Sequence, residues 1–218
     1  MKVRIEWQYK TTKGKRSLAF TSDFQEIQEI LFFAEDIEKT GRVKELVFVD
    51  EQGSEWLKKD LEKYIKSIET EPHNIVASFD GGYNVTDKEA GVGFIIHYDQ
   101  SGESFRLRKN QRLEQLNSNN EAEYAALWNL LLSLEELGAH HIPVTFKGDS
   151  LVVINQLNGE WPCYEEELNR WLDRIEEKVK QLGLIPTYEA VSRKENKAAD
   201  HLATQALEGV MVSSNLKL

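Results

Sequence analysis

Hydrophobic and polar residues follow two different rhythms along the chain, and these rhythms predict its strands and helices. In the first 68 residues, stretches with alternating apolar positions predict strands, and stretches with apolar residues three or four apart predict helices. Asp23 is the expected cap of the first helix. The expected strands are residues 1–9, 15–22 and 43–50, the expected helices are residues 24–39 and 55–68, and a turn is expected at residues 11–15. We therefore expect residues 1–68 to form a small α+β domain.

The remaining residues alternate strands with long helices in the order βββαβααβα. A polar stretch with a proline, residues 69–74, is the expected linker, and residues 209–218 are a tail that is either loose or docked. The expected strands are residues 75–82, 90–99, 103–113, 142–149 and 184–192, and the expected helices are residues 120–137, 150–158, 165–182 and 196–207. Three antiparallel strands followed by strand–helix units predict an α/β fold over residues 75–208, with a mixed five-stranded sheet flanked by helices.

The composition indicates a cytoplasmic globular protein without disulfides. Cys163 is the single cysteine among 218 residues, so an internal disulfide and a zinc-finger-like cluster are excluded. No stretch approaches the roughly 20 apolar residues that span a bilayer. Residues 1–10 lack the apolar core of a signal peptide. We therefore expect no association with membranes.

The charge of the chain is negative but uneven. A formal net charge of −10 argues against a protein that coats nucleic acid nonspecifically. Basic residues nevertheless gather at three places, where solubility is the simplest explanation and a local nucleic-acid contact is the alternative. The three clusters are six basic residues within residues 1–20, then Arg106, Arg108, Lys109 and Arg112, and finally Arg193, Lys194 and Lys197.

Four acidic residues occur where the hydrophobic pattern places buried positions or strand ends. Asp80 ends an apolar strand, and Asp149 ends another strand directly before a helix. Glu123 shares a helix face with several leucines, and Asp200 lies among small and apolar residues of the last helix. Each acid alone has an ordinary explanation, such as a turn, a helix cap or an outward-facing side chain. Glu121, two residues before Glu123, is expected to be an ordinary acid of the first helical turn.

Taken together, the four acids predict a metal site. Buried carboxylates repel each other and are costly unless cations pair with them. No lysine or arginine stands beside all four in the sequence. Mg²⁺ prefers oxygen ligands and keeps phosphate oxygens in its coordination shell. Four acids suit two such ions, with Mn²⁺ as an alternative, in phosphodiester hydrolysis.

Four motifs then show a resemblance to the ribonuclease H type 1 family over residues 74–208. They are a strand followed by Asp80-Gly81-Gly82, the helix start SNNEAEYAAL at residues 118–127, the segment GDSLVVINQL at residues 148–157, and RKENKAADHLA at residues 193–203. The resemblance implies a ribonuclease H-like fold and hydrolysis of the RNA strand of RNA–DNA hybrids. It also implies that Asp80, Glu123, Asp149 and Asp200 bind the metal ions.

The same resemblance implies a set of residues that bind the nucleic acid. Asn119 and Asn120 match residues that contact the minor groove of the hybrid, where amide groups can recognise the 2′-hydroxyl. Gly81 would let the substrate backbone approach closely. Ser118 and Arg193 complete the expected substrate-binding set.

The chain departs from the family pattern in ways that leave a second interpretation open. The loop before Asp200 contains no histidine, and His201 follows the acid instead. The basic protrusion of some members is absent, and the segment EEELNRWLDRIEEK at residues 165–178 is acidic. A catalytically silent scaffold that binds nucleic acid or protein is therefore the alternative to an endonuclease.

The role of residues 1–68 stays open because their sequence does not show the aromatic and glycine pattern of the hybrid-binding module found in some relatives. Trp7, Tyr9 and the basic residues nearby would suit contact with nucleic acid. Trp7 can equally belong to the domain's own core, with the lysines on its surface. A protein partner for residues 1–68 is the third interpretation.

Overall fold

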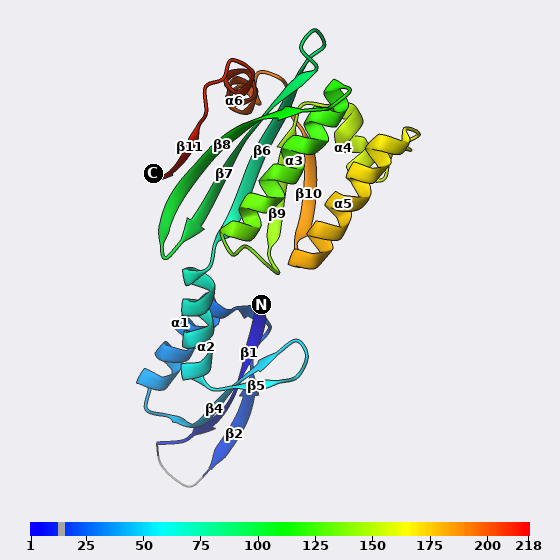
Figure 1. Cartoon of the computed structure of the whole chain (residues 1–218). Coiled ribbons are helices and arrows are strands. Elements are labelled where there is room, and N and C mark those ends of the chain that lie inside the picture. The colour runs from blue at the N-terminus through cyan, green and yellow to red at the C-terminus, as the bar shows by residue number, and fades with distance from the viewer. Residues whose placement is uncertain (13–15) are drawn as a thin grey trace. The chain divides into compact units, whose positions relative to one another are not determined.

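The computed structural model describes residues 1–12 and 16–218, so part of the expected turn at residues 11–15 lies outside the described residues. The chain forms two compact units, Met1–Ile68 and Glu69–Leu218 (Figure 1). Among the described residues, no helix is long and apolar enough to cross a membrane.

The N-terminal unit is an antiparallel sheet with two helices. Its strands are β1 (Lys2–Lys10), β2 (Ser17–Thr21), β3 (Gln25–Glu26), β4 (Val43–Asp50) and β5 (Glu55–Trp56), and its helices are α1 (Ile27–Lys39) and α2 (Lys58–Thr70). The strand order is β2-β1-β4-β5, with β3 paired to β1. Alternate residues of β1, Val3 and Ile5, are fully buried with Phe48 and with apolar residues of both helices. The period-two pattern of the sequence therefore marks the face of the sheet that packs against the helices.

Both helices of this unit begin later than the sequence predicts. Residues 25–26 pair with β1 as β3, so α1 starts at Ile27 and Asp23 is not its cap. The residue before α1 is Glu26, whose side chain makes no capping bond. Likewise, Glu55 and Trp56 pair with β4, so α2 starts at Lys58. Pairing between distant strands replaces the first helical turn in both cases, and local periodicity does not reveal it.

The larger unit contains a six-stranded mixed sheet. Its strands are β6 (His73–Asn84), β7 (Glu89–Gln100), β8 (Glu103–Glu114), β9 (Pro143–Gly148), β10 (Ile185–Ala190) and β11 (Ser213–Lys217). Its helices are α3 (Asn119–Glu136), α4 (Leu151–Leu157), α5 (Glu166–Leu182) and α6 (Lys197–Leu207). The strand order is β10-β9-β6-β7-β8-β11, in which β6, β9 and β10 are parallel and the other pairs are antiparallel. The expected mixed α/β architecture is thus present, with a sixth strand in addition to the five expected.

The sixth strand comes from the tail at residues 209–218, which docks. β11 pairs with β8, and the buried side chain of Asn110 on β8 fixes the chain that leads to β11. Its amide donates to Leu202 O and Val210 O, both at 2.9 Å, and its oxygen accepts from Val212 N. The expected linker at residues 69–74 is also shorter than predicted, because α2 runs to Thr70 and β6 starts at His73.

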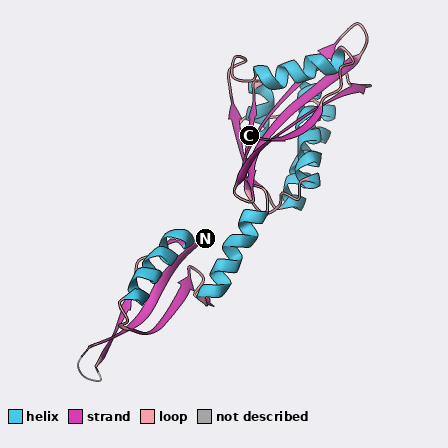
Figure 2. Cartoon of the chain, turned by 90° about the vertical axis from the view of Figure 1, so that its left-hand side faces the viewer, coloured by secondary structure: helices cyan, strands magenta, loops and turns pink. Residues whose placement is uncertain are grey.

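Helices cover both faces of the sheet (Figures 1 and 2). Successive strand residues point to opposite faces. A Cβ on Gly81 would overlap the backbone of Ala122 in α3, whereas a Cβ on Gly82 would meet Leu207 of α6. Helices α3 and α6 therefore lie on opposite sides of β6.

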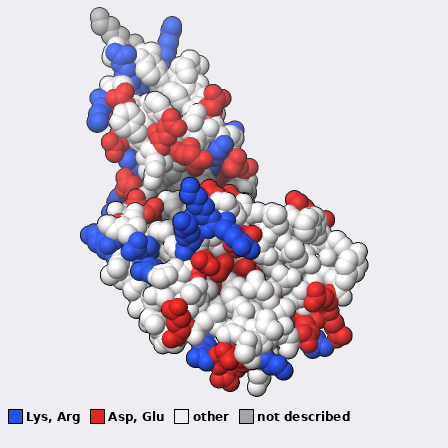
Figure 3. All heavy atoms as spheres, turned by 90° about the horizontal axis from the view of Figure 1, so that it is seen from above, with Lys and Arg blue, Asp and Glu red and all other residues white. Residues whose placement is uncertain are grey.

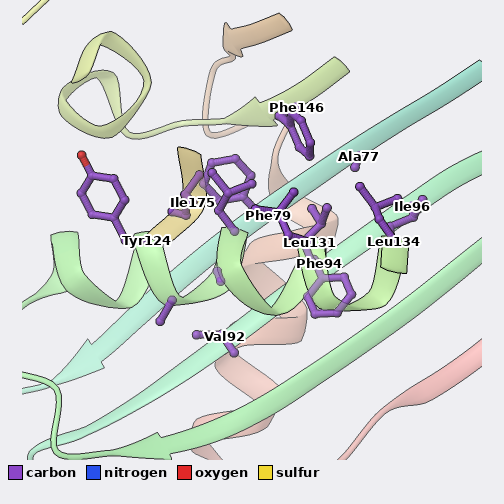
Figure 4. Close-up of a cluster of buried hydrophobic side chains, with 14 of the residues drawn as sticks. Ala77, Phe79, Val92, Phe94, Ile96, Tyr124, Leu131, Leu134, Phe146 and Ile175 are labelled. Atoms are coloured by element: carbon purple, nitrogen blue, oxygen red, sulfur yellow. The ribbon is translucent and has the colours of Figure 1, made fainter. Parts of the chain in front are cut away.

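The main core lies between the sheet and α3, with α5 behind it. Figure 4 shows Phe79 of β6, Phe146 of β9 and Leu131 of α3 in this core, together with Ile175 of α5. All four side chains have no exposed surface. Because α3 packs against both the sheet and α5, apolar residues lie around much of its circumference. A carboxylate buried on α3 therefore calls for an explanation.

Candidate active site

Asp80 lies in the middle of β6, contrary to the expectation that it ends the strand. β6 continues through the two glycines to Asn84, and Asp80 pairs with Gly93 of β7. Gly93 faces α6, because a Cβ there would lie 2.5 Å from Ala203 N. Residues paired across antiparallel strands share a face. The side chain of Asp80 therefore leaves the strand on the α6 side of the sheet, and the residue is only 7% exposed.

Glu123 comes to the same place from the opposite side. The start of α3 can approach β6 because Gly81, next to Asp80, has no side chain to separate them. The N–H of Gly81 donates a hydrogen bond to the Glu123 carboxylate. Glu123 is 3% exposed. Contact with α3 is thus sufficient to explain the glycine, and the predicted approach of substrate to Gly81 stays a prediction.

Asp149 joins these two acids through the parallel pairing of β6 and β9. Ser78 pairs with Lys147, so Asp80 and Asp149, each two residues further along, are neighbours. The carboxylates of Asp80, Glu123 and Asp149 each offer an oxygen, and these oxygens lie within 4.8 Å of one another. Asp149 does not cap α4, because Ser150 Oγ accepts from Val153 N and performs that role. The structure thus excludes the ordinary explanation for Asp149.

Asp200 lies in the first turn of α6 and is exposed at the edge of the same hollow. It is not part of the cluster of three oxygens within 4.8 Å. Its position is set by close packing of α6 on β7, where Ala199 and Ala203 lie against the two glycines of the strand. The charge of Asp200 still acts on Asp80. The structure therefore brings all four predicted acids to one hollow, three of them in direct proximity.

Asn196 is a site residue that the sequence analysis missed. It is 1% exposed at the start of α6, and its Nδ2 donates to Phe79 O at 2.9 Å. The same nitrogen lies 3.4 Å from Asp80 Oδ1 and from Asp149 Oδ1. The only sequence signal for it is a polar residue at a helix start. An amide that touches two carboxylates reduces their repulsion and links α6 to β6.

The electrostatics show that the protein alone does not neutralise the cluster. Burial raises the pKa of Glu123 to about 9, and the charges of Asp80 and Asp149 add to the effect. Burial likewise raises the pKa of Asp80 to about 7, and the charges of Asp149 and Asp200 are the next largest causes of the increase. Arg193 opposes both shifts, but its side chain is 96% exposed and its Nε lies 3.9 Å from Asp149 Oδ2. A surface cation of this kind compensates little of the repulsion.

A divalent cation fits this donor set. Glu123 Oε2 is buried and has no hydrogen-bond partner among the described residues. Buried polar atoms without partners are rare, and each calls for an explanation such as an ion. Carboxylate oxygens are also the donors that Mg²⁺ prefers. Asp80, Glu123 and Asp149 are therefore the residues that would hold a metal ion, with Asp200 at the rim.

Most of the residues expected to bind substrate line the hollow. Ser118 does not, because it caps α3 by accepting a hydrogen bond from Glu121 N. Ser150 and Gly82 line it but were not expected, although both belong to the motifs already noted. The lining residues are Asp80, Gly81, Gly82, Asn119, Asn120, Glu123, Asp149, Ser150, Arg193 and Asp200.

Glu121 lies in the first turn of α3, as expected, but it is buried. It is only 8% exposed, and its carboxylate accepts from Asn117 N at 2.7 Å and from Trp171 Nε1 at 3.1 Å. Trp171 lies on α5, so Glu121 ties the start of α3 to a neighbouring helix. Both glutamates of the motif are buried. Protein donors reach both oxygens of Glu121, whereas Glu123 Oε2 has no partner among the described residues.

Two basic residues of the cluster on β8 pair with acids. Arg112 pairs with Glu89, and Lys109 lies 2.5 Å from Glu136. Figure 3 shows basic and acidic side chains interspersed on the face that it draws. In the N-terminal unit, Trp7 is half-buried and stacks on Phe20 with ring centres 5.3 Å apart. This packing supports the interpretation of Trp7 as part of the unit's own core.

Comparisons with known proteins concern the part of the chain that contains this site. A family model described as "Reverse transcriptase-like" matches residues 78–206, which include all four acids. The uncharacterized protein YpeP of Bacillus subtilis is 44% identical over 207 residues, which are 94% of this chain and 91% of that protein. Since the match covers 94% of the chain, it also includes most of the N-terminal unit.

Two further matches each cover about three fifths of the chain. Ribonuclease HI of Halobacterium salinarum is 29% identical over 137 residues, which are 61% of this chain and 63% of that protein. The crystal structure of RNase H1 from the same archaeon matches with a TM-score of 0.53 and 26% identity, over 62% of this chain and 98% of that chain. These matches confirm the expected ribonuclease H-like fold.

Proposed function

Because the chain belongs to the reverse transcriptase-like family and has a ribonuclease H-like fold, we propose that it is a divalent-metal-dependent endonuclease that hydrolyses the RNA strand of RNA–DNA hybrids. The observation that carries the proposal is the cluster of Asp80, Glu123 and Asp149, whose oxygens lie within 4.8 Å of one another. A buried group of like charges is costly in a protein that does not use it.

The four acids hold the metal ions in this proposal and are not themselves nucleophiles. Asp80, Glu123 and Asp149 supply closely spaced oxygens, and Asp200 adds an exposed carboxylate at the edge of the hollow. Two Mg²⁺ ions, when bound, would supply an activated water and stabilisation of the leaving oxygen. Mn²⁺ also accepts oxygen ligands and is the expected substitute.

Recognition of the hybrid is assigned to residues at the mouth of the hollow. Asn119 and Asn120 stand at the start of α3, where their amides can donate to and accept from 2′-hydroxyl groups in a wide minor groove. Arg193 is nearly fully exposed beside Asp149, so it is free to contact a backbone phosphate. Ser118 caps α3 and does not line the hollow, so its predicted contact with substrate stays a prediction.

The test is cleavage of an RNA–DNA hybrid by the purified full chain, with Mg²⁺ and separately with Mn²⁺. An RNA duplex and a DNA duplex of the same sequence serve as substrate controls. We expect cleavage of the hybrid's RNA strand only, and a loss of at least ~100-fold in the Asp149→Asn variant. The parent and the variant should unfold at similar temperatures, so that a folding defect is separated from a catalytic one.

The alternative is a silent scaffold of the same fold, which the exposed acids of α5 favour because they would repel nucleic acid. Those acids are Glu166, Glu167, Asp173, Glu176 and Glu177. No cleavage with either metal at high enzyme concentration, together with retained binding of the hybrid, would establish this alternative. Equal cleavage by the Asp149→Asn variant would refute the assignment of the site.

A further inference from the structure

Strand β2 is a free edge of the N-terminal sheet. It stands last in the strand order and, in the described part of the chain, pairs only with β1. All five of its residues are exposed, and they include Leu18 at 61% and Phe20 at 42%. An exposed apolar edge strand that contains neither proline nor charge is a template for pairing with another strand. The sequence of β2, SLAFT, contains neither proline nor a charged residue.

The hydrogen bonds to β1 show which residues of β2 direct their backbone groups outward. Thr11 N donates to Arg16 O at 3.2 Å, and Ser22 N donates to Ile5 O at 2.9 Å. Backbone groups alternate between the two edges of a strand, so even-numbered residues from 16 to 22 bond to β1. The residues whose N–H and C=O groups point to the free edge are therefore Ser17, Ala19 and Thr21.

We propose that two copies of this chain pair antiparallel through β2, with the two-fold axis at Ala19. Each Ala19 then faces Ala19 of the second copy, and each Ser17 faces Thr21. Every such pair exchanges two N–H···O bonds, so the contact contains about six hydrogen bonds. A two-fold contact requires a surface that is complementary to itself, and a strand whose free groups are centred on one residue provides it.

The side chains of β2 are symmetric about the same residue. Leu18 and Phe20 flank Ala19 and lie on one face, so Leu18 of one copy stands opposite Phe20 of the other. These are non-hydrogen-bonded pairs, in which side chains lie closest. Phe20 is already held by stacking on Trp7. Pairing would thus remove two exposed apolar side chains per copy from water.

Charge complementarity favours a second copy over an unrelated strand. Arg16 precedes β2 and Asp23 follows it, and both are exposed. In the register centred on Ala19, Arg16 of one copy faces Ser22 of the other and lies beside its Asp23. The two-fold axis repeats this contact at the other end of the strand. At each end of the paired strands, a basic residue of one copy therefore lies near an acidic residue of the other.

A disulfide cross-link tests both the contact and its register, in the full chain with Cys163→Ser to remove the native thiol. The two Ala19 Cα atoms would lie about 5.5 Å apart, as expected for a hydrogen-bonded pair. That distance suits a disulfide. Ala19→Cys with oxidised glutathione as oxidant should therefore give a covalent dimer whose disulfide is reduced by dithiothreitol. The matched control is Ser17→Cys, because the two Ser17 residues would be roughly 13 Å apart along the strands. It should form no covalent dimer alone and should cross-link when mixed with Thr21→Cys.

Mass measurement by light scattering tests the contact without a cross-link. Proline is tolerated in an edge strand where its missing N–H faces outward. Ala19→Pro should therefore stay folded by circular dichroism and lose the concentration-dependent dimer, whereas Ala19→Thr should keep it. The proposal is overturned if Ala19→Cys gives no dimer, or if Ser17→Cys alone cross-links equally well. Hybrid cleavage does not enter this test, so its outcome is independent of the proposed function.

Discussion

The side chain of Asn196 donates a hydrogen bond to the backbone oxygen of Phe79 at 2.9 Å, and this bond joins the start of α6 to strand β6. Its nitrogen also lies 3.4 Å from an oxygen of Asp80 and of Asp149. A neutral donor thus occupies the position between two acids where a lysine or arginine would compete with a metal ion. The amide limits repulsion without neutralising the site.

Replacing Asn196 should therefore lower the stability by an amount that depends on charge. Asn196→Ala leaves the buried oxygen of Phe79 without its donor, which costs about 1–3 kcal/mol. Asn196→Asp adds a further carboxylate beside Asp80, so at pH 7 it should cost more than the alanine variant. Urea denaturation at pH 7 and at pH 4 measures both. The excess cost of Asn196→Asp should shrink at pH 4, and an aspartate variant as stable as the parent at pH 7 would contradict this account.

The two glutamates of the α3 motif should respond in opposite ways to replacement by glutamine. Glu121→Gln loses one of two acceptor oxygens and should destabilise the protein by about 1–2 kcal/mol, with little change in cleavage rate per folded molecule. Glu123→Gln removes an acid whose raised pKa makes folding less favourable at neutral pH, so the metal-free protein should be at least as stable as the parent while cleavage is lost. Thermal denaturation and the hybrid assay on both variants check this. Equal effects on cleavage would show that Glu121 also belongs to the metal site.

The pH dependence of stability should show the raised pKa values of the acid cluster. Above its ordinary value of 4.5, Glu123 ionises in the unfolded chain but holds its proton in the folded chain up to about 9. Folding then binds a proton, so stability due to this group is full below pH 4.5 and falls as the pH rises toward 9. Asp80 acts in the same direction up to about 7. In metal-free buffer, the parent should lose stability relative to Glu123→Gln between pH 5 and pH 9.

Added Mg²⁺ provides the control for that experiment. A cation that binds the folded state alone stabilises it, by about 1.4 kcal/mol when its concentration is tenfold above Kd. Mg²⁺ should therefore raise the melting temperature of the parent more at pH 8 than at pH 5, because the carboxylates are more ionised at pH 8. Asp149→Asn should reduce this increase. An identical increase in parent and variant would place the bound ion elsewhere.

The sequence predicts well those features that repeat locally or that chemistry makes conspicuous. The long helix α3 has a strong apolar pattern, and an acid such as Glu123 within it is conspicuous. The features that it misses depend on partners far along the chain. Strand β5 forms because Trp56 meets β4, and β11 forms because Asn110 fixes the approach of the tail. Nothing near Asn196 in the sequence indicates that its amide reaches Phe79, 117 residues away.

Glu121 illustrates the same limit within the motif at the start of α3. A first-turn acid is commonly exposed, because the helix dipole alone favours it there. Its burial depends on Trp171 of α5, which is 50 residues further along the chain. Spacing within one helix therefore identifies which face is buried, but not which side chains of neighbouring elements complete it.

The close packing of α6 on β7 should control both stability and the position of Asp200. A Cβ on Gly93 would lie 2.5 Å from Ala203 N and 2.6 Å from Leu202 Cβ, and backbone cannot move aside as a flexible side chain can. Gly93→Ala should therefore displace α6, cost roughly 1–3 kcal/mol and reduce hybrid cleavage. Gly82→Ala is the matched control on the same face, because its Cβ would meet only Leu207 Cδ1 at an ordinary 3.5 Å. Denaturation of both variants separates the two cases, and the cleavage assay concerns Gly93→Ala, because Gly82 itself lines the hollow. If Gly82→Ala were as destabilising as Gly93→Ala, the close approach of α6 to β7 would not be what makes glycine necessary at position 93.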